Sequence, residues 1–302
     1  TWPTTDHLPV TLMNAIVMQG KALAEKKQKH LKETIKATQL PAAQFAGPPH
    51  LVVMIVGNDP ASHLYVNTKQ KRCEAVGMQS TRIGLSDTIS ETGLLAEIEA
   101  LNQDPNVHGI LVQLPLPDHI STQNVIQAIA PDKDVDGFHP FNLGRLAQKA
   151  PLLRPCTPWG IMQLLSHYDI PLKGQHAVIL GTSTIVGLPM SLELLTAQAT
   201  ITVCHRQTKH LMQLTQQADL LITATGQPEM INAEYIKQGA VVIDVGITRL
   251  DDGRIVGDVH FDSVVAKAGW ITPVPGGVGP MTVTALLQNT WDAYCKQVGN
   301  AS

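Results

Sequence analysis

The sequence predicts an α/β protein of two domains, each built on a mainly parallel sheet with flanking helices. Short runs rich in Val, Ile and Leu alternate with helical stretches over nearly the whole chain, as in sheets whose crossover helices cover both faces. A Pro-rich segment at 150–160 interrupts this alternation near the middle. The length of 302 residues is also typical of about two domains.

Each predicted strand is a short run of aliphatic and β-branched residues. The runs lie at 51–57, 80–85 and 109–114 in the first half and at 176–181, 200–205, 219–226 and 240–246 in the second. The order of strand, turn and helix in the second half is typical of a dinucleotide-binding sheet. We therefore expect a Rossmann-like second domain.

Two long helices are expected near the ends of the chain. The first extends over 12–38, has apolar residues at helical spacing, and should pack across the first sheet. The last, 281–298, follows a glycine-rich segment and should cross back onto the first domain. We accordingly assign 1–155, completed by 281–302, to a catalytic domain and 156–280 to a nucleotide-binding domain.

Composition restricts the classes of function. Hydrophobic residues make up 44% of the chain, and the net charge of −3 gives no basic field of the kind that nucleic acid or an anionic membrane requires. No apolar run reaches the roughly 18 residues that span a bilayer. We expect a soluble, cytoplasmic protein that acts on small molecules.

Cysteine and histidine spacing gives little support for a metal site. The four cysteines, Cys73, Cys156, Cys204 and Cys295, lie too far apart for a CxxC motif and are too few for a disulfide scaffold. The 12 histidines form no HExxH or comparable pattern. We expect reduced, structural cysteines and no bound metal.

The run NDPASHLYVNTKQK at 58–71 predicts a helix that opens with an Asp-Pro start signal. Ser62, Tyr65 and Lys69 would then lie within an arc of roughly 60° on one helix face. A lysine beside an aromatic ring in a half-dry pocket is a usable acid or base, because burial disfavours the ammonium form. The alternative is a solvated helix face with an exposed lysine.

Two further segments place polar side chains near the ends of predicted strands. Gln113 precedes the LPLP turn at the carboxyl edge of the first sheet, where its amide could orient Lys69 or satisfy turn backbone. In DKDVDGFHP, an extended chain would put Asp132, Asp134 and Asp136 on one side. A metal site is conceivable there, but one carboxylate accepting paired N–H bonds from a planar heterocycle is the better interpretation, with a structural Asp-rich turn as the alternative.

The segment GTSTIVG, Gly181 to Gly187, follows a strand and opens a helix, where glycine lets backbone approach a pyrophosphate. It departs from GxGxxG at Ser183, and an ordinary strand-to-helix turn is the alternative. The next strand ends in His205 and Arg206, with Thr208 and Lys209 close behind, rather than in an acidic residue. Cations here favour the 2′-phosphate of NADP over NAD, although a basic surface turn would read the same way.

Taken together, the ordered motifs resemble one known family. They are VGNDPASHLYVNTKQKRCEAVG, GILVQLPLP, PDKDVDGFHPFNLGRL, RPCTPWG, GTSTIVGLPMS, VIDVGI and TPVPGGVGPMT. The chain resembles the bifunctional methylenetetrahydrofolate dehydrogenase/methenyltetrahydrofolate cyclohydrolase family, particularly its bacterial members, over nearly its whole length. The resemblance implies an NADP-dependent enzyme of one-carbon metabolism with a folate substrate, and a homodimer formed through the cofactor domains.

The resemblance also implies roles for individual residues. Lys69 would be the general acid/base and Tyr65 would stack on the folate, while Gln113 would tune Lys69 and Asp136 would hold the pterin. The implied substrate-binding residues are Ser62, Tyr65, Lys69, Val112, Gln113, Leu114, Asp136, Pro275, Gly276, Gly277, Val278 and Gly279. The implied cofactor-binding residues are Gly181, Thr182, Ser183, His205, Arg206 and Ile247.

Two other functions compete with this hypothesis. A two-domain NADP dehydrogenase for a shikimate-type or amino-acid substrate would share the fold without folate chemistry. The order of Tyr65, Lys69, Gln113 and Asp136 argues against it. A folate or nucleotide sensor without turnover is the non-enzymatic alternative, against which the intact Lys69 argues.

Overall fold

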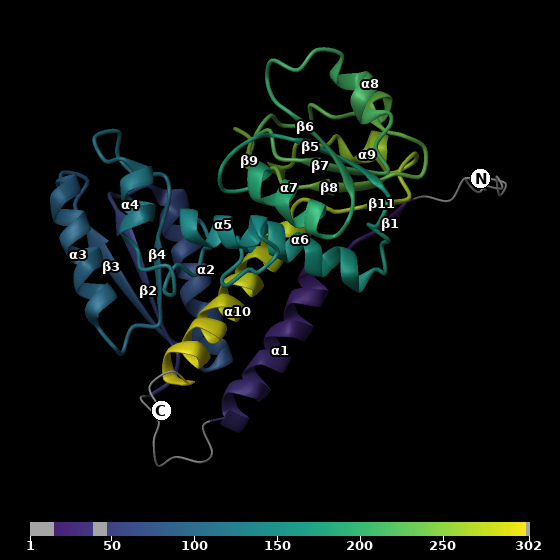
Figure 1. Cartoon of the computed structure of the whole chain (residues 1–302). Helices are drawn as coiled ribbons and strands as arrows, with labels where there is room; N and C mark the ends of the chain where they lie inside the picture. Colours follow the sequence, from purple (N-terminus) through teal and green to yellow (C-terminus); the bar gives the residue numbers. More distant parts are fainter. Residues whose placement is uncertain (1–14, 39–46, 300–302) are drawn as a thin grey trace.

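The computed structural model describes residues 15–38 and 47–299, apart from the side chains of Pro60 and Ala61. A three-stranded and a six-stranded sheet, each flanked by helices, form two lobes (Figure 1). Both sheets are parallel throughout, which confirms the predicted α/β fold class. The N-terminal segment 1–10, to which the sequence assigns no function, and the first residues of the predicted helix at 12–38 lie outside the described residues.

The first lobe is built on three strands in the order β3-β2-β4. They are β2 (His50–Val56), β3 (Gln79–Leu85) and β4 (Gly109–Val112), and the helices around them are α2 (Pro60–Val76), α3 (Glu91–Gln103), α4 (Thr122–Ala128) and α5 (Pro140–Ala147). The central strand β2 is buried on both faces, because Leu51, Val53 and Ile55 enter one core while the residues between them enter another.

The second lobe contains the six-stranded sheet, in the order β1-β11-β8-β7-β5-β6. Its strands are β1 (Ile16–Val17), β5 (His176–Leu180), β6 (Thr200–Cys204), β7 (Leu220–Thr223), β8 (Val241–Asp244) and β11 (Trp270–Ile271). The surrounding helices are α6 (Cys156–His167), α7 (Gly187–Thr196), α8 (Leu211–Thr215) and α9 (Phe261–Val264), with a 3-10 turn at Ala233–Tyr235. An antiparallel hairpin of β9 (Thr248–Arg249) and β10 (Ile255–Val256) completes the lobe.

The predicted helix at 12–38 is wrong at its start. Ile16 and Val17 form β1, which pairs with β11 in the second sheet, and helix α1 extends over Gly20–Thr38. The structure requires glycine at position 20, because a Cβ there would lie 1.8 Å from the Gly277 oxygen. As predicted, the far end of α1 enters the first core, through Leu31 and Ile35.

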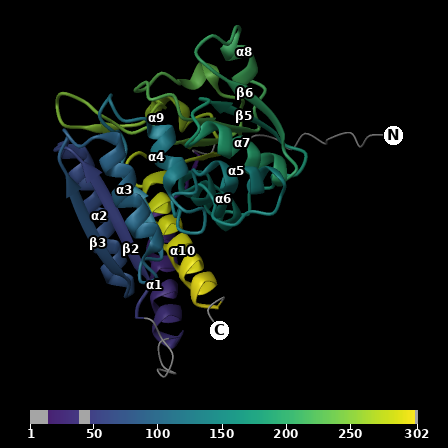
Figure 2. The ribbon, with the colours of Figure 1, turned by 60° about the vertical axis from the view of Figure 1, so that its left-hand side comes forward.

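The last helix, α10 (Val278–Gly299), crosses from the second lobe to the first, as predicted, and begins three residues earlier than expected. Val278 and Met281 belong to the core of the second lobe, whereas Leu286 and Leu287 belong to that of the first. It packs along α1 and α6, and α1 and α10 run side by side in both views (Figure 2). These two helices therefore hold the lobes together.

Asn289 on α10 connects two backbone segments that are not part of either sheet. Its buried Nδ2 donates to the carbonyl of Val135, in the turn after α4, and to the carbonyl of Arg154, in the linker before α6, both at 2.8 Å. A single amide thus satisfies two acceptors from parts of the chain that no strand connects.

Replacing Asn289 with alanine should destabilise the protein by about 1–3 kcal/mol, the cost of leaving the buried Arg154 carbonyl unpaired, since the Val135 carbonyl keeps the Cys156 thiol as a donor. Urea unfolding followed by circular dichroism measures the change. Gln288→Ala, which removes only an exposed bond to Asp292, is the matched control. Equal stability of the two variants would contradict the bridging role of Asn289.

Candidate active site

Helix α2 presents the three residues that the sequence predicts on its face. Asp59 caps the helix by accepting a hydrogen bond from the Ser62 backbone N–H at 2.7 Å. Ser62 is buried, Lys69 is half-buried and Tyr65 is 45% exposed. The half-buried Lys69 differs from the fully solvated lysine of the alternative interpretation.

Gln113 and Lys69 lie in contact at the carboxyl end of β4. Lys69 Nζ donates to Gln113 Oε1 at 3.1 Å, while Gln113 Nε2 donates to the Leu114 carbonyl at 2.7 Å. The bond to Leu114 decides which end of the amide faces the lysine, because a flipped amide would present N–H to an ammonium group. Both interpretations of Gln113 therefore hold, since it satisfies turn backbone and orients Lys69.

Asp136 is the acidic partner in this cluster. Burial raises the pKa of its carboxyl, and the charge of Lys69 offsets part of that rise. The backbone around Asp136 is fixed as well, because the Cys156 N–H donates to its carbonyl at 3.2 Å. We name Lys69, Gln113 and Asp136 the polar cluster.

The other two aspartates of the same loop do not join the polar cluster. The expected extended chain is wrong here, because residues 131–133 and 135–136 form turns on either side of a bridge between Asp134 and Ile110. Asp134 is buried and accepts bonds from the His139 N–H and the Asn142 amide, both at 2.8 Å, whereas Asp132 is exposed. Among the described residues no three His, Cys, Asp or Glu side chains converge as metal ligands would.

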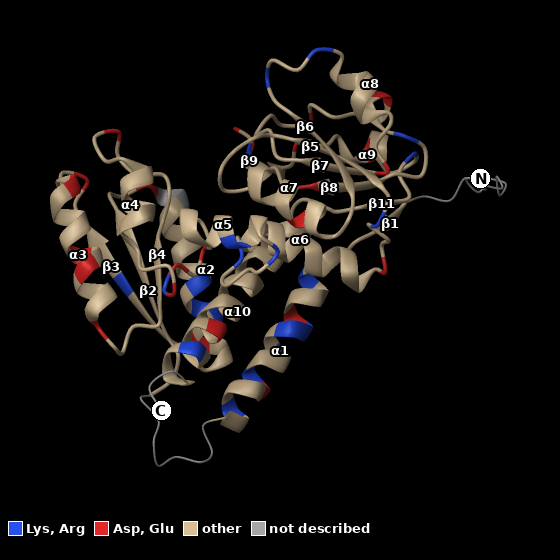
Figure 3. Cartoon of the chain, viewed as in Figure 1, with Lys and Arg blue, Asp and Glu red and all other residues tan. Residues whose placement is uncertain are grey.

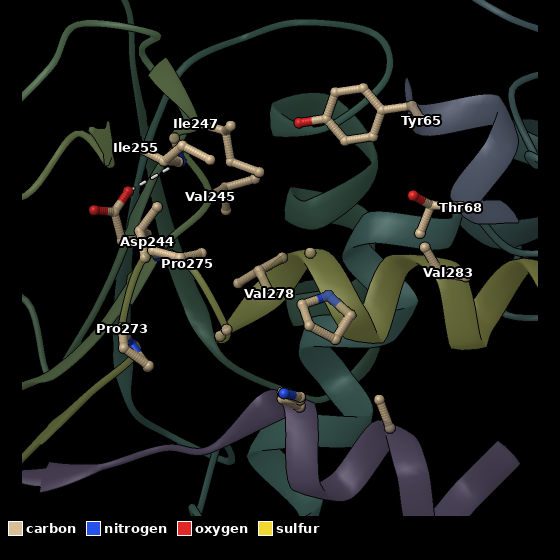
Figure 4. A pocket seen from close by; sticks show the side chains of 18 of the residues that line it. Tyr65, Thr68, Asp244, Val245, Ile247, Ile255, Pro273, Pro275, Val278 and Val283 are labelled. Carbon is tan, nitrogen blue, oxygen red and sulfur yellow. Dashed lines mark hydrogen bonds between the residues drawn. The ribbon is translucent and has the colours of Figure 1, made fainter. Parts of the chain in front are cut away.

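A cavity of about 330 Å³ lies between the lobes (Figure 4). Tyr65 reaches across it toward Ile247 and Ile255, and the segment Pro275–Gly279 forms another wall. Six predicted substrate-binding residues, Ser62, Lys69, Val112, Gln113, Leu114 and Asp136, are not part of its wall. The polar cluster therefore lies outside this cavity, and α2 connects the two because it carries both Lys69 and Tyr65.

A second cavity, of about 640 Å³, opens at the carboxyl ends of β5, β6 and β7. The predicted residues Gly181, Thr182, His205 and Arg206 line it. Two other predicted cofactor residues do not. Ser183 Oγ accepts bonds from the N–H groups of Val186 and Gly187 at the start of α7, and Ile247 lines the cavity between the lobes.

This second cavity fits a dinucleotide. Gly181 has a φ of +120°, and a Cβ there would lie 2.3 Å from the Ala224 oxygen. A Cβ on Gly187 would lie 2.0 Å from the Gly181 oxygen, so both positions need glycine for the close turn that brings backbone to a phosphate. Arg206 is exposed and has no ion pair within residues 15–38 and 47–299, which leaves its guanidinium available to an anion.

The sequence did not single out Asp244, which shapes the wall between the lobes. Its buried carboxyl accepts bonds from the N–H groups of Gly246, Asp258 and Val259, at 2.9–3.0 Å. Burial raises its pKa to about 6. These bonds tie the turn after β8 to the segment after β10. The signal was an acidic residue at the end of an otherwise apolar strand.

Helix α1 also contributes cavity residues that sequence reasoning missed. Lys21 and Gln28, seven positions apart and thus on one helix face, line the cavity together with Arg72 of α2. Basic residues recur along α1 (Figure 3). Arg72 Nη1 donates to Gln28 Oε1 at 3.4 Å. The helical spacing was visible in the sequence, but the partner surface was not.

Comparisons with known proteins agree with this geometry. The family model for the catalytic domain of tetrahydrofolate dehydrogenase/cyclohydrolase matches residues 18–136, and that for its NAD(P)-binding domain matches residues 155–298. The chain belongs to the tetrahydrofolate dehydrogenase/cyclohydrolase family. The predicted family and enzyme class are thereby confirmed.

Individual relatives cover nearly the whole chain. Bifunctional protein FolD 1 of Hydrogenovibrio crunogenus is 50% identical over 281 residues, which are 93% of this chain and 98% of that protein. The crystal structure of the bifunctional enzyme FolD from Campylobacter jejuni is 47% identical, with a TM-score of 0.90 over 95% of this chain and 100% of that one. The Trypanosoma brucei FolD, complexed with NADP cofactor and inhibitor, is 36% identical, with a TM-score of 0.90 over 95% and 99%.

A more distant likeness bears on the shikimate alternative. Shikimate dehydrogenase 1 from Peptoclostridium difficile is 12% identical, with a TM-score of 0.51 over 82% of this chain and 92% of that one. That likeness shows the fold alone. Membership of the tetrahydrofolate dehydrogenase/cyclohydrolase family therefore decides between the two enzyme hypotheses.

Replacing Asp136 with asparagine should stabilise the folded protein near neutral pH. Because the folded pKa lies above the unfolded value of about 3.9, the unfolded chain loses its proton first, and native stability falls as pH rises from the unfolded to the folded pKa. The variant escapes this loss. Its advantage should disappear below the unfolded pKa, where both states of the wild type are protonated.

Denaturant unfolding across a pH series measures this difference. The exposed Asp132→Asn in the same loop controls for the loss of one negative charge. A gain for Asp136→Asn that does not change with pH, or that Asp132→Asn reproduces, would contradict the effect of burial.

Proposed function

We propose that this chain oxidises 5,10-methylenetetrahydrofolate to 5,10-methenyltetrahydrofolate with NADP+ and hydrolyses the product to 10-formyltetrahydrofolate. One observation carries the proposal. Lys69 of the polar cluster lies about one helical turn after Tyr65 on α2, and Tyr65 borders the cavity between the lobes. An acid/base group, a carboxylate and an aromatic ring are thus placed next to the lobe that holds the dinucleotide cavity.

Three side chains would hold the folate. Tyr65 offers a ring face at the rim of the cavity, suited to offset stacking on a planar ring. The Asp136 carboxylate would accept paired N–H bonds from the pterin, which suits an acceptor with two oxygens. Pro275–Gly279 would lie along the rest of the substrate, since this segment lines the same cavity.

Lys69 would move the proton in the hydrolytic step. Its Nζ is held by Gln113 Oε1 and lies within the electrostatic reach of Asp136. Held in this way, the amine would assist proton transfers as water adds to the one-carbon bridge and the ring opens. All three members of the polar cluster belong to the first lobe, so this step needs no group of the second sheet.

The cofactor cavity would hold NADP. Bound NADP+ supplies the hydride acceptor. The turn from Gly181 to Gly187 would receive the pyrophosphate at the start of α7, and Arg206 would pair with the 2′-phosphate, with His205 and Thr182 in the same wall. A relative of 36% identity is described as a complex with NADP, which supports the choice of cofactor.

Three finer properties complete the proposal. Residues 1–155 with 281–302 would form the folate domain and 156–280 the NADP domain, with β1 joining the latter through its sheet. The edge strand β6, with Val203 exposed, would support a homodimer through the NADP domains. The enzyme would act in the cytoplasm, and no helix of the described part is long and apolar enough to cross a bilayer.

Replacing Lys69 with methionine should lower cyclohydrolase activity by about 10²- to 10⁴-fold, the usual contribution of general acid/base catalysis. The decay of added methenyltetrahydrofolate, followed by absorbance, measures the loss. Lys71→Met, on the exposed side of the same helix, is the matched control. Full activity of Lys69→Met would refute the assigned role, and binding without turnover by the wild type would identify a sensor.

Replacing Arg206 with alanine should weaken NADP binding by roughly 10- to 100-fold and leave NAD binding nearly unchanged, because the lost charge-assisted bonds involve the 2′-phosphate alone. Dissociation constants for both cofactors test this. Lys173→Ala, an exposed cation before β5, is the control. Tighter binding of NAD than of NADP by the wild type would remove the claim.

A further inference from the structure

A buried ion pair joins the linker between the lobes to α7, the helix that starts at the glycine turn of residues 181–187, which we call the dinucleotide turn. Arg154 Nε donates to Glu193 Oε1 at 2.8 Å, and Arg154 Nη2 donates to Glu193 Oε2, so the pair is bidentate. The Glu193 side chain is fully buried in the second turn of α7, and that of Arg154 is 29% exposed. The guanidinium also lies 5.5 Å from the ring centre of Trp159.

One end of this pair is fixed to the cofactor site. Helix α7 begins at Gly187, which is packed so tightly against the Gly181 carbonyl that no Cβ fits between them. Since an α-helix is rigid over ten residues, a shift of Glu193 would be transmitted to the dinucleotide turn.

The Arg154 end of the pair is fixed to the turn that contains Asp136, the carboxylate proposed to bind the substrate. The Arg154 carbonyl accepts the Asn289 amide, and a Cβ on Gly137, next to Asp136, would lie 2.5 Å from the Arg154 carbonyl carbon. Two residues further on, the Cys156 N–H donates to the Asp136 carbonyl. The backbone of Arg154 is therefore held against the turn of Asp136, while its side chain is bound to Glu193 on α7.

We propose that the ion pair between Arg154 and Glu193 positions the dinucleotide turn relative to Asp136 and so serves hydride transfer. The inference rests on the proposed function. Hydride transfer requires cofactor and folate, held by different lobes, to meet with ångström accuracy, and a misplacement of about 1 Å costs roughly 100-fold. The hydrolytic step uses the polar cluster, which lies within the first lobe. Arg154 and Glu193 are thus positioning residues for one of the two reactions.

Glu193→Gln tests the inference, because it keeps the shape of the side chain and removes its charge. The dehydrogenase kcat should fall about 10- to 100-fold, while the cyclohydrolase kcat and the dissociation constants of NADP and folate stay close to wild type. Arg154→Lys keeps the charge but loses the planar fork, so its dehydrogenase kcat should lie between those of the wild type and Glu193→Gln. Lys237→Gln removes the exposed ion pair with Asp219 in the same lobe and is the matched control.

The outcomes are distinguishable. A selective loss of dehydrogenase activity supports the positioning role, whereas equal loss of both activities together with a lowered melting temperature shows a structural role only and overturns it. Unchanged activities also overturn it. If Glu193→Gln does not fold, the ratio of the two activities in Arg154→Lys decides. Absence of both activities from the wild type would refute the proposed function instead.

Discussion

The side-chain amide of Asn289 is the contact on which the arrangement of the site depends. Its Nδ2 donates to the carbonyl of Val135, next to Asp136, and to the carbonyl of Arg154, in the linker that leads into the second lobe. Because Asn289 lies on α10, whose first turn belongs to the core of the second lobe, the same helix contacts the turn that contains Asp136 and lines the cavity beside Tyr65. Relative placement of the lobes is therefore set by α1 and α10, two helices that each contribute residues to both cores.

The groups proposed to act in the two reactions are divided unequally between the two lobes. The polar cluster lies in the first lobe, where Gln113 is held by the Leu114 carbonyl and in turn holds Lys69. The second lobe contributes the dinucleotide cavity and, through the turn fixed by Asp244, the wall with Ile247. In the proposed reactions, hydrolysis and hydride transfer would depend on different structural requirements, although the product of the hydride transfer is the substrate of the hydrolysis. A protein with this division can lose the accuracy of one reaction and retain the other.

The sequence predicted the elements better than their partners. Long apolar runs and the motifs at 58–71 and 181–187 placed the strands, the Lys69 face and the glycine turn, because these depend on local periodicity. Ile16 was assigned to a helix because a two-residue strand has no period of its own, and only β11 makes it a strand. Arg154 and Glu193 are 39 residues apart, and nothing local to either residue indicates that they meet.

The aspartates show most clearly what sequence alone leaves open. Three of them alternate over five residues, and by pattern they are equivalent. In the fold, Asp134 is buried but receives N–H bonds from His139, Phe138 and Asn142, so its carboxyl is occupied by bonds within its own loop. The side chain of Asp136 is compensated mainly by the positive charge of Lys69, and burial still raises its pKa. A carboxylate left short of donors in this way costs stability without a ligand, and it gains most when a substrate supplies N–H groups. What makes Asp136 the candidate for the pterin is therefore that its carboxyl has no backbone donor among residues 15–38 and 47–299, a property that no spacing in the sequence expresses.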